Sequence, residues 1–130
     1  MGWKTVGPCT YCKLSVIIVG EKPHIASSGK NVESIQELTN VTVQVGGNAT
    51  VIIGTNLKIT CPVKGKPAPS ITWYKQGMEL RDGDNLLIDN STRSLNILKV
   101  QYDASGTYQC VAKNPLGVDQ MTTYLLPIGL

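Results

Sequence analysis

From residue 41 onward, apolar and polar residues alternate in short runs that are separated by turn residues. Residues 41–45 alternate valine with threonine and glutamine, and Leu57, Ile59 and Cys61 alternate with polar neighbours. Successive side chains of a β-strand point to opposite faces of a sheet, so each run has one apolar face and one polar face. Glycine, proline, asparagine and aspartate end the runs, as is typical of turns between strands. The pattern predicts an all-β fold.

Further apolar runs extend this pattern almost to the end of the chain. The expected strands that follow are residues 71–75, 78–81, 86–88, 95–100, 107–113 and 118–125. Turn residues separate them at 65–69, 82–85, 89–92 and 114–117, and the last of these turns is expected to be a hairpin. Turns at such short intervals leave little room for a helix.

Two cysteines, a tryptophan and a tyrosine occur at a characteristic spacing. Cys61 precedes Trp73 by one strand and one turn, and Cys110 ends the run Asp-Ala-Ser-Gly-Thr-Tyr-Gln-Cys. In these features the chain resembles the immunoglobulin superfamily. It is similar to the I-set subclass in Gly-x-Pro-x-Pro at 65–69, Trp-Tyr-Lys at 73–75 and Ala-Lys-Asn-x-x-Gly at 112–117. The resemblance covers nearly all of residues 41–126 and implies a β-sandwich of two antiparallel sheets.

The resemblance assigns structural roles to these residues. It implies a disulfide between Cys61 and Cys110 that joins the two sheets, with Trp73 packed beside it and Tyr108 forming a tyrosine corner. The alternative is two unrelated buried thiols. A salt bridge between Arg81 and Asp103 is expected across one end of the sandwich. The remaining expected core residues are Leu57, Ile59, Ile71, Leu95 and Ile97.

Three N-x-S/T sequons point to an oxidising, extracellular environment. They begin at Asn40, Asn48 and Asn90, each beside an expected turn or strand end, and all three are predicted glycosylation sites. A disulfide favours the same compartment, because such bonds persist outside the reducing cytosol. The I-set domains of muscle filaments are the intracellular alternative.

These sequons also indicate where a partner could bind. The resemblance places Asn90 in a connection of the ABED sheet, and Asn40 and Asn48 near the first strand of that sheet. The opposite CFG sheet would then be comparatively free of glycans. We expect a protein partner on that sheet or on the hairpin at 114–117, at Tyr74, Gln76, Gln109, Val111, Lys113, Asn114 and Gly117. The alternative is a spacer domain that binds nothing itself.

The first 38 residues differ in composition from the rest of the chain. We expect residues 1–38 to be a poorly ordered extension, residues 39–127 to be the folded domain and residues 128–130 to be a short tail. Cys9 and Cys12 form a C-x-x-C motif, but the chain offers neither a second such motif nor a second histidine beside His24 to complete a zinc site. It also lacks the βαβ pattern of a thioredoxin-like motif. Their role stays open.

Charge and motifs argue against catalysis and against nucleic-acid binding. The net charge is +3, and the basic residues are interspersed with acidic ones instead of forming a stripe. Nucleophile-elbow, phosphate-loop and zinc-protease motifs are missing from the sequence. Asp82 and Asp84 flank a loop glycine, where we expect solvated turn residues rather than a calcium site. We expect no cofactor, no metal and no enzymatic activity.

The run at residues 45–56 narrows the resemblance further. Val-Gly-Gly-x-Ala-Thr-Val-Ile-Ile-Gly-Thr-Asn is similar to immunoglobulin repeats of secreted matrix glycoproteins of the ADAMTS-like and papilin type. This implies a non-catalytic, extracellular protein-binding module of a longer multidomain chain, with no membrane insertion. The alternatives are the ectodomain of a cell-surface adhesion molecule or receptor, a structural spacer, and an accessory domain of a proteinase or growth-factor-binding protein.

Overall fold

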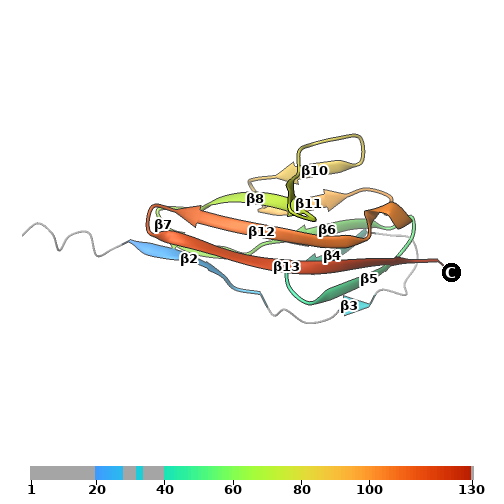
Figure 1. Ribbon diagram of the computed structural model, residues 1–130, viewed down its shortest axis with the longest axis horizontal. Helices are drawn as coiled ribbons and strands as arrows, with labels where there is room; N and C mark the ends of the chain where they lie inside the picture. Colours follow the sequence, from blue (N-terminus) through green and yellow to red (C-terminus); the bar gives the residue numbers. More distant parts are fainter. Residues whose placement is uncertain (1–19, 28–31, 34–39, 130) are drawn as a thin grey trace, which may run out of the picture.

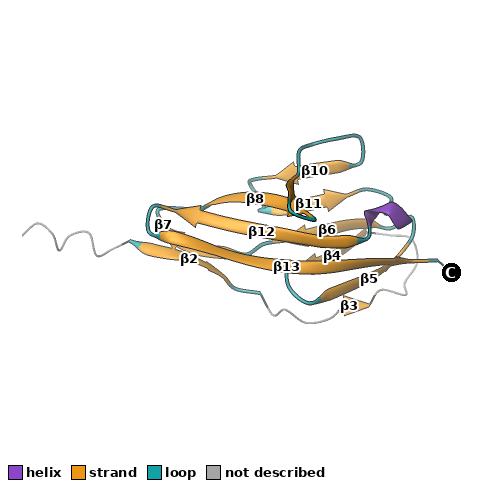
Figure 2. Cartoon of the chain, viewed as in Figure 1, coloured by secondary structure: helices purple, strands orange, loops and turns teal. Residues whose placement is uncertain are grey.

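The computed structural model of the chain describes residues 20–27, 32–33 and 40–129. These residues form strands that are joined by short loops, with one turn of 3-10 helix at Tyr102–Ala104 (Figure 2). The strands stack as two layers along the long axis of the molecule (Figure 1). The predicted all-β sandwich is confirmed.

One layer is a sheet of four strands. Its order is β10 (Leu86–Asp89), β11 (Ser94–Ile97), β6 (Asn56–Thr60) and β4 (Asn40–Gln44). The first three strands are antiparallel, whereas β4 runs parallel to β6 and forms the edge.

The other layer is a sheet of six strands. Its order is β3 (Val32–Glu33), β5 (Asn48–Ile52), β13 (Gly117–Ile128), β12 (Gly106–Asn114), β8 (Ser70–Lys75) and β9 (Met78–Glu79). Strand β5 is parallel to both β3 and β13, so the two sheets are antiparallel in their centres and mixed at their edges. Strand β13 continues through Ile128, which pairs with Ile52, so the domain does not end at residue 127.

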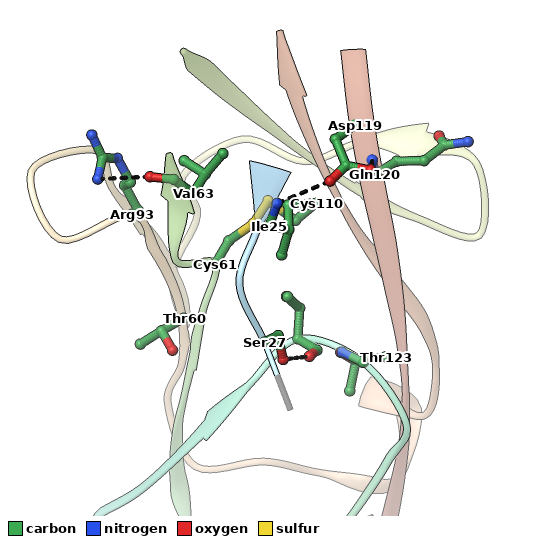
Figure 3. The surroundings of a disulfide bond; sticks show 12 residues. Ile25, Ser27, Thr60, Cys61, Val63, Arg93, Cys110, Asp119, Gln120 and Thr123 are labelled. Atoms are coloured by element: carbon green, nitrogen blue, oxygen red, sulfur yellow. Dashed lines mark hydrogen bonds between the residues drawn. A yellow bond between two sulfur atoms is a disulfide. The ribbon is translucent and has the colours of Figure 1, made fainter. Parts of the chain in front are cut away.

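A disulfide and an indole join the two layers. Cys61, just after β6, bonds to Cys110 in β12 (Figure 3). Trp73 on β8 is the register partner of Cys110. Cys61, Cys110 and Trp73 are buried. The predicted disulfide is therefore present. Of the other predicted core residues, Leu57, Ile59, Leu95, Ile97 and Tyr108 are buried, and Ile71 packs half-buried at the margin.

A short strand upstream of residue 39 belongs to the same domain. Strand β2 (Glu21–Ile25) pairs antiparallel with β7 (Val63–Lys66), and Ile25 is only 3% exposed. Its backbone N–H donates to Asp119 Oδ2 at 2.9 Å, which ties β2 to β13 (Figure 3). The prediction of a poorly ordered extension is therefore wrong for this segment, and the domain begins well before residue 39. Residues 1–19, with Cys9 and Cys12, lie outside the described part of the chain.

Strands β4 and β5 lie in two imperfect copies of one sequence pattern. Residues 40–47 read Asn-Val-Thr-Val-Gln-Val-Gly-Gly, and residues 48–55 read Asn-Ala-Thr-Val-Ile-Ile-Gly-Thr. The glycines at the end of the first copy have positive φ (105° at Gly46 and 65° at Gly47), a conformation that glycine adopts without steric cost, and the chain reverses there. The first copy then lies in the four-stranded sheet and the second in the six-stranded sheet.

Candidate partner-binding face

The outer face of the six-stranded sheet presents rows of side chains in register. Paired residues on neighbouring strands point to the same side of a sheet. Two rows cross β8, β12 and β13, and they are Tyr74–Gln109–Thr122 and Thr72–Val111–Gln120. We call this surface the outer face.

Four of the predicted partner residues lie on this outer face. Tyr74, Gln109 and Val111 are half-buried, and Lys113 is exposed. The Gln109 side-chain amide donates to Gln120 Oε1 at 2.8 Å, which links the two polar side chains across β12 and β13. The result is a fixed surface of mixed polarity, which is the general composition of protein–protein interfaces.

The other three predicted residues contact other parts of the same domain. Gln76 Oε1 accepts hydrogen bonds from the backbone N–H and the hydroxyl of Thr107, at 2.6 and 2.9 Å. Asn114 is 8% exposed, and its amide donates to the backbone carbonyls of Glu21 and Pro67. The expectation of an exposed hairpin is therefore wrong for Asn114, because this side chain joins the hairpin to β2. A Cβ at Gly117 would lie 3.4 Å from side-chain carbons of Lys22, so this position is also partly covered.

Strand β13 contributes face residues that sequence reasoning missed. Every second residue of this strand is exposed or half-buried on the outer face, namely Val118, Gln120, Thr122, Tyr124 and Leu126. Tyr124 and Leu126 are each 42% exposed. The period-two alternation over residues 118–126 is visible in the sequence and was the signal available for finding them.

The three sequon asparagines lie on both sheets instead of one. Asn40 is on β4, and Asn90 lies in the turn between β10 and β11, so both belong to the four-stranded sheet. Asn48 begins β5 and pairs with Tyr124 on the six-stranded sheet. The expectation that the six-stranded sheet lacks a sequon is therefore wrong. The cause is the repeat, which places the second copy of the sequon in the opposite sheet.

Hydrogen bonds hold the turn that carries Asn90. Asp89 Oδ1 accepts from the Ser91 hydroxyl at 2.7 Å and from the backbone N–H groups of Ser91 and Thr92. The bonds from Ser91 and Thr92 lower the pKa of Asp89 below its usual value, because they favour the ionised carboxylate. This turn is therefore ordered while the Asn90 side chain is exposed.

The predicted salt bridge between Arg81 and Asp103 is not formed. Both side chains are exposed, and no ion pair links them within the described part of the chain. Lys75 instead donates to the backbone carbonyl of Asp103 at 2.9 Å, and its ammonium lies 5.5 Å from the centre of the Tyr108 ring. Lys75 thus contacts the backbone of Asp103 and makes a cation–π contact with Tyr108.

Tyr108 fixes the end of β12 beneath the outer face. Its hydroxyl donates to the carbonyl oxygen of Ala104 at 2.5 Å, across the 3-10 turn, as the tyrosine corner requires. Burial and, as the smaller cause, the nearby charge of Asp103 together raise the pKa of Tyr108 to about 12. The hydroxyl stays protonated at neutral pH and keeps donating.

One surface hollow has a volume of about 360 Å³ and is lined by Asn40, Asn56, Lys58, Asn96 and neighbouring residues of the four-stranded sheet. Among the residues that the structure describes, no group of three or more His, Cys, Asp or Glu side chains could hold a metal ion. The same residues include no helix long and apolar enough to cross a membrane.

Comparison with known proteins identifies the family. The model of the immunoglobulin I-set domain matches residues 35–126. ADAMTS-like protein 3 of Homo sapiens is 38% identical over 111 residues, which are 85% of this chain and 6% of that protein. Hemicentin-2 of Mus musculus is 35% identical over 61% of this chain and 2% of its own length. The chain therefore spans a small part of these relatives.

Receptors and muscle proteins are similar as well. Vascular endothelial growth factor receptor 2 of Mus musculus is 34% identical over 63% of this chain and 6% of the receptor. A chimeric titin Z1Z2 structure covers 85% of this chain and 99% of its own, with a TM-score of 0.62 and 25% identity. The complex of titin M10 with an obscurin-like 1 immunoglobulin domain gives a TM-score of 0.65 at 18% identity, covering 85% of this chain and 97% of that one. The latter likeness concerns the fold alone.

Proposed function

The chain belongs to the immunoglobulin I-set family, and from this premise we propose that it is a non-catalytic protein-binding module of a secreted matrix glycoprotein. Immunoglobulin domains of this family occur in matrix proteins and in cell-surface receptors, within longer chains. The domain would bind its partner through the outer face of β8 and β12.

Two features support an extracellular location. The Cys61–Cys110 disulfide joins the sheets through the core, and such bonds persist in oxidising compartments. All three sequon asparagines lie at surface positions: Asn40, Asn48 and Asn90 are exposed. The similarity to ADAMTS-like protein 3 and hemicentin-2 favours a matrix protein over a muscle filament.

The main support for this binding site is the strand register that aligns residues on the outer face. Tyr74, Gln109 and Val111 lie side by side on adjacent strands, and each is only half-buried although it belongs to the centre of the sheet. Aromatic residues are enriched at interfaces, because they bury a large area at a small cost in side-chain entropy. A flat surface built on central strands is also rigid before binding, which limits the entropy lost on association.

The test is to add a bulky glycan at the centre of this face. Val111→Asn with Lys113→Thr creates the sequon Asn-Ala-Thr there. Lys58→Asn creates Asn-Ile-Thr on the outer side of the four-stranded sheet and serves as the matched control. Each secreted variant is measured for retention on matrix laid down by cultured fibroblasts, after mass spectrometry has shown that the new site is occupied.

We expect the variant at residue 111 to lose retention and the variant at residue 58 to keep it. The reverse result would move the binding site to the four-stranded sheet. If the unmodified domain is not retained at all, the spacer alternative is favoured instead.

A further inference from the structure

Tyr124 and Leu126 are apolar side chains that protrude from the sheet next to a sequon. Strand β5 runs parallel to β13, with Asn48 opposite Tyr124 and Thr50 opposite Leu126. The Tyr124 backbone N–H donates to the Gly47 carbonyl at 3.0 Å, which fixes this register. Both apolar side chains are 42% exposed, and Asn48 is exposed beside them. The acceptor asparagine and the apolar pair therefore share one side of the sheet.

We infer that Asn48 carries an N-linked glycan whose first sugar packs on Tyr124 and Leu126 as an intramolecular cover. The C–H groups on one face of a pyranose ring are apolar, and they can lie against an aromatic ring or a leucine methyl group. Contiguous apolar surface on a folded protein commonly marks a site that something covers. The covering group here would be supplied by the neighbouring strand of the same domain.

The covalent step is that of ordinary N-glycosylation, which requires the secretory location proposed above. The Asn48 amide nitrogen forms a bond to C1 of the first sugar and loses a proton. The bond between C1 and the diphosphate oxygen of a lipid-linked sugar donor breaks, and the diphosphate leaves. The folded geometry matters after this step, because strand pairing then brings the attached sugar to Tyr124.

The other two sequons lack such a neighbour. The side chain of Asn40 accepts a hydrogen bond from the Asn56 amide at 3.0 Å, and its register partner is that same polar residue. Asn90 lies in the turn after β10, where Pro69, Ser70, Ile71 and Arg93 line the adjacent hollow. Among the described residues, Asn48 is thus the sequon asparagine that pairs with an aromatic side chain.

A glycan at this site would also delimit the partner-binding face. It would cover the β5–β13 side of the six-stranded sheet and leave the β8–β12 side open, where Tyr74, Gln109 and Val111 lie. The glycan would thereby protect the apolar part of this sheet without covering the proposed binding surface.

The experiment compares stability with and without the first sugar. The protein is secreted from eukaryotic cells, and an endoglycosidase trims each glycan to a single N-acetylglucosamine. This form is compared with Asn48→Gln in urea unfolding, first with Tyr124 and then in a Tyr124→Thr background, which keeps strand propensity. With Tyr124 present, we expect the sugar to lower the unfolding equilibrium constant roughly three- to tenfold, the size of a stacked aromatic contact. In the Tyr124→Thr background we expect no effect of the sugar.

Two controls make the result specific. Tyr74→Thr alters another tyrosine of the same sheet and should leave the effect of the sugar unchanged. Proton NMR of the trimmed protein should show upfield ring-current shifts of the sugar protons at Asn48, a readout that does not depend on stability.

The inference is overturned if Asn48 is unoccupied in the secreted protein, if Tyr124→Thr leaves the stabilisation intact, or if the ring-current shifts are missing. Occupied Asn40 and Asn90 beside an empty Asn48 would overturn this inference while leaving the secreted module in place.

Discussion

Tyr108 shows how a single hydroxyl holds the end of the six-stranded sheet. The Tyr108→Phe substitution removes the hydrogen bond to the Ala104 carbonyl and leaves that acceptor without its partner in a mostly buried position. We expect the free energy of unfolding at pH 7 to fall by roughly 1–3 kcal/mol, the usual penalty for an unsatisfied buried group. Urea unfolding of the two proteins measures the difference.

The alkaline pH profile of the same pair tests the environment of Tyr108. Its pKa is raised to about 12 in the folded protein, whereas an unfolded tyrosine ionises near pH 10. The raised value stabilises the fold below pH 10, and this contribution is lost as the pH rises from about 10 to 12. Over that range the wild-type protein should lose roughly 2–3 kcal/mol that Tyr108→Phe does not lose. A constant difference between the two proteins would contradict the buried, protonated hydroxyl.

Among the elements, β2 and its partner β7 are concealed by the sequence. Most strands between residues 41 and 125 are predictable from apolar residues at period two between clear turn residues, but β7 has a single buried apolar residue and overlaps the turn expected at 65–69. Strand β2 buries only Pro23 and Ile25, two apolar residues among the polar Glu21, Lys22 and His24. Its place depends on pairing with β7 and on the hydrogen bond that the Ile25 backbone N–H donates to Asp119, and neither contact leaves a local pattern.

Long-range contacts of this kind also explain the errors in the predicted partner-binding site. The residues of β8 and β12 on the outer face follow from strand alternation alone, and so they could be predicted. The buried position of Asn114 could not, because its main partner is the carbonyl of Glu21 in the strand that local pattern did not reveal. The parallel pairing of β5 with β13 is likewise a long-range contact, which is why Asn48 was expected on the wrong sheet.

Truncating the buried side chain of β2 tests whether this strand belongs to the domain. Ile25→Ala should lower the free energy of unfolding by about 2–5 kcal/mol, through lost burial and the cavity that remains. His24→Ala, which alters an exposed residue of the same strand, should change it by no more than about 0.5 kcal/mol. Thermal unfolding of the two variants gives the comparison. Equal, small effects would return residues 20–27 to the status of a linker.

Because β4 lies within one copy of the repeat, it can be deleted together with that copy as a unit. Deleting residues 40–47 removes one whole copy and leaves the second copy with the same first residue type, asparagine. Pairing of β5 with β13 should survive, but Val43 and Val45, which are 4% and 0% exposed, would be lost from the core. We expect a folded protein that is less stable by roughly 3–6 kcal/mol, the burial of two valines. A near-ultraviolet circular dichroism spectrum without the native tryptophan signal would show that β4 is indispensable.

For the whole molecule, the disulfide makes the stability of the domain depend on whether its compartment is oxidising or reducing. Cys61 and Cys110 are 49 residues apart, so in the chain-entropy model their bond contributes about 4 kcal/mol by restricting the unfolded state. A domain of this size commonly has only about 5–15 kcal/mol in total. The double variant Cys61→Ala/Cys110→Ala should therefore unfold at a much lower urea concentration.

The urea dependence separates an effect on the unfolded chain from an effect on the folded core. Without the cross-link the unfolded chain expands and exposes more surface, so the slope of unfolding free energy against urea should rise while the midpoint falls. A lower midpoint with an unchanged slope would instead assign the loss to packing around Trp73. A variant as stable as the wild type would remove the argument that this domain depends on an oxidising compartment, and the sequons alone would then support a secreted module.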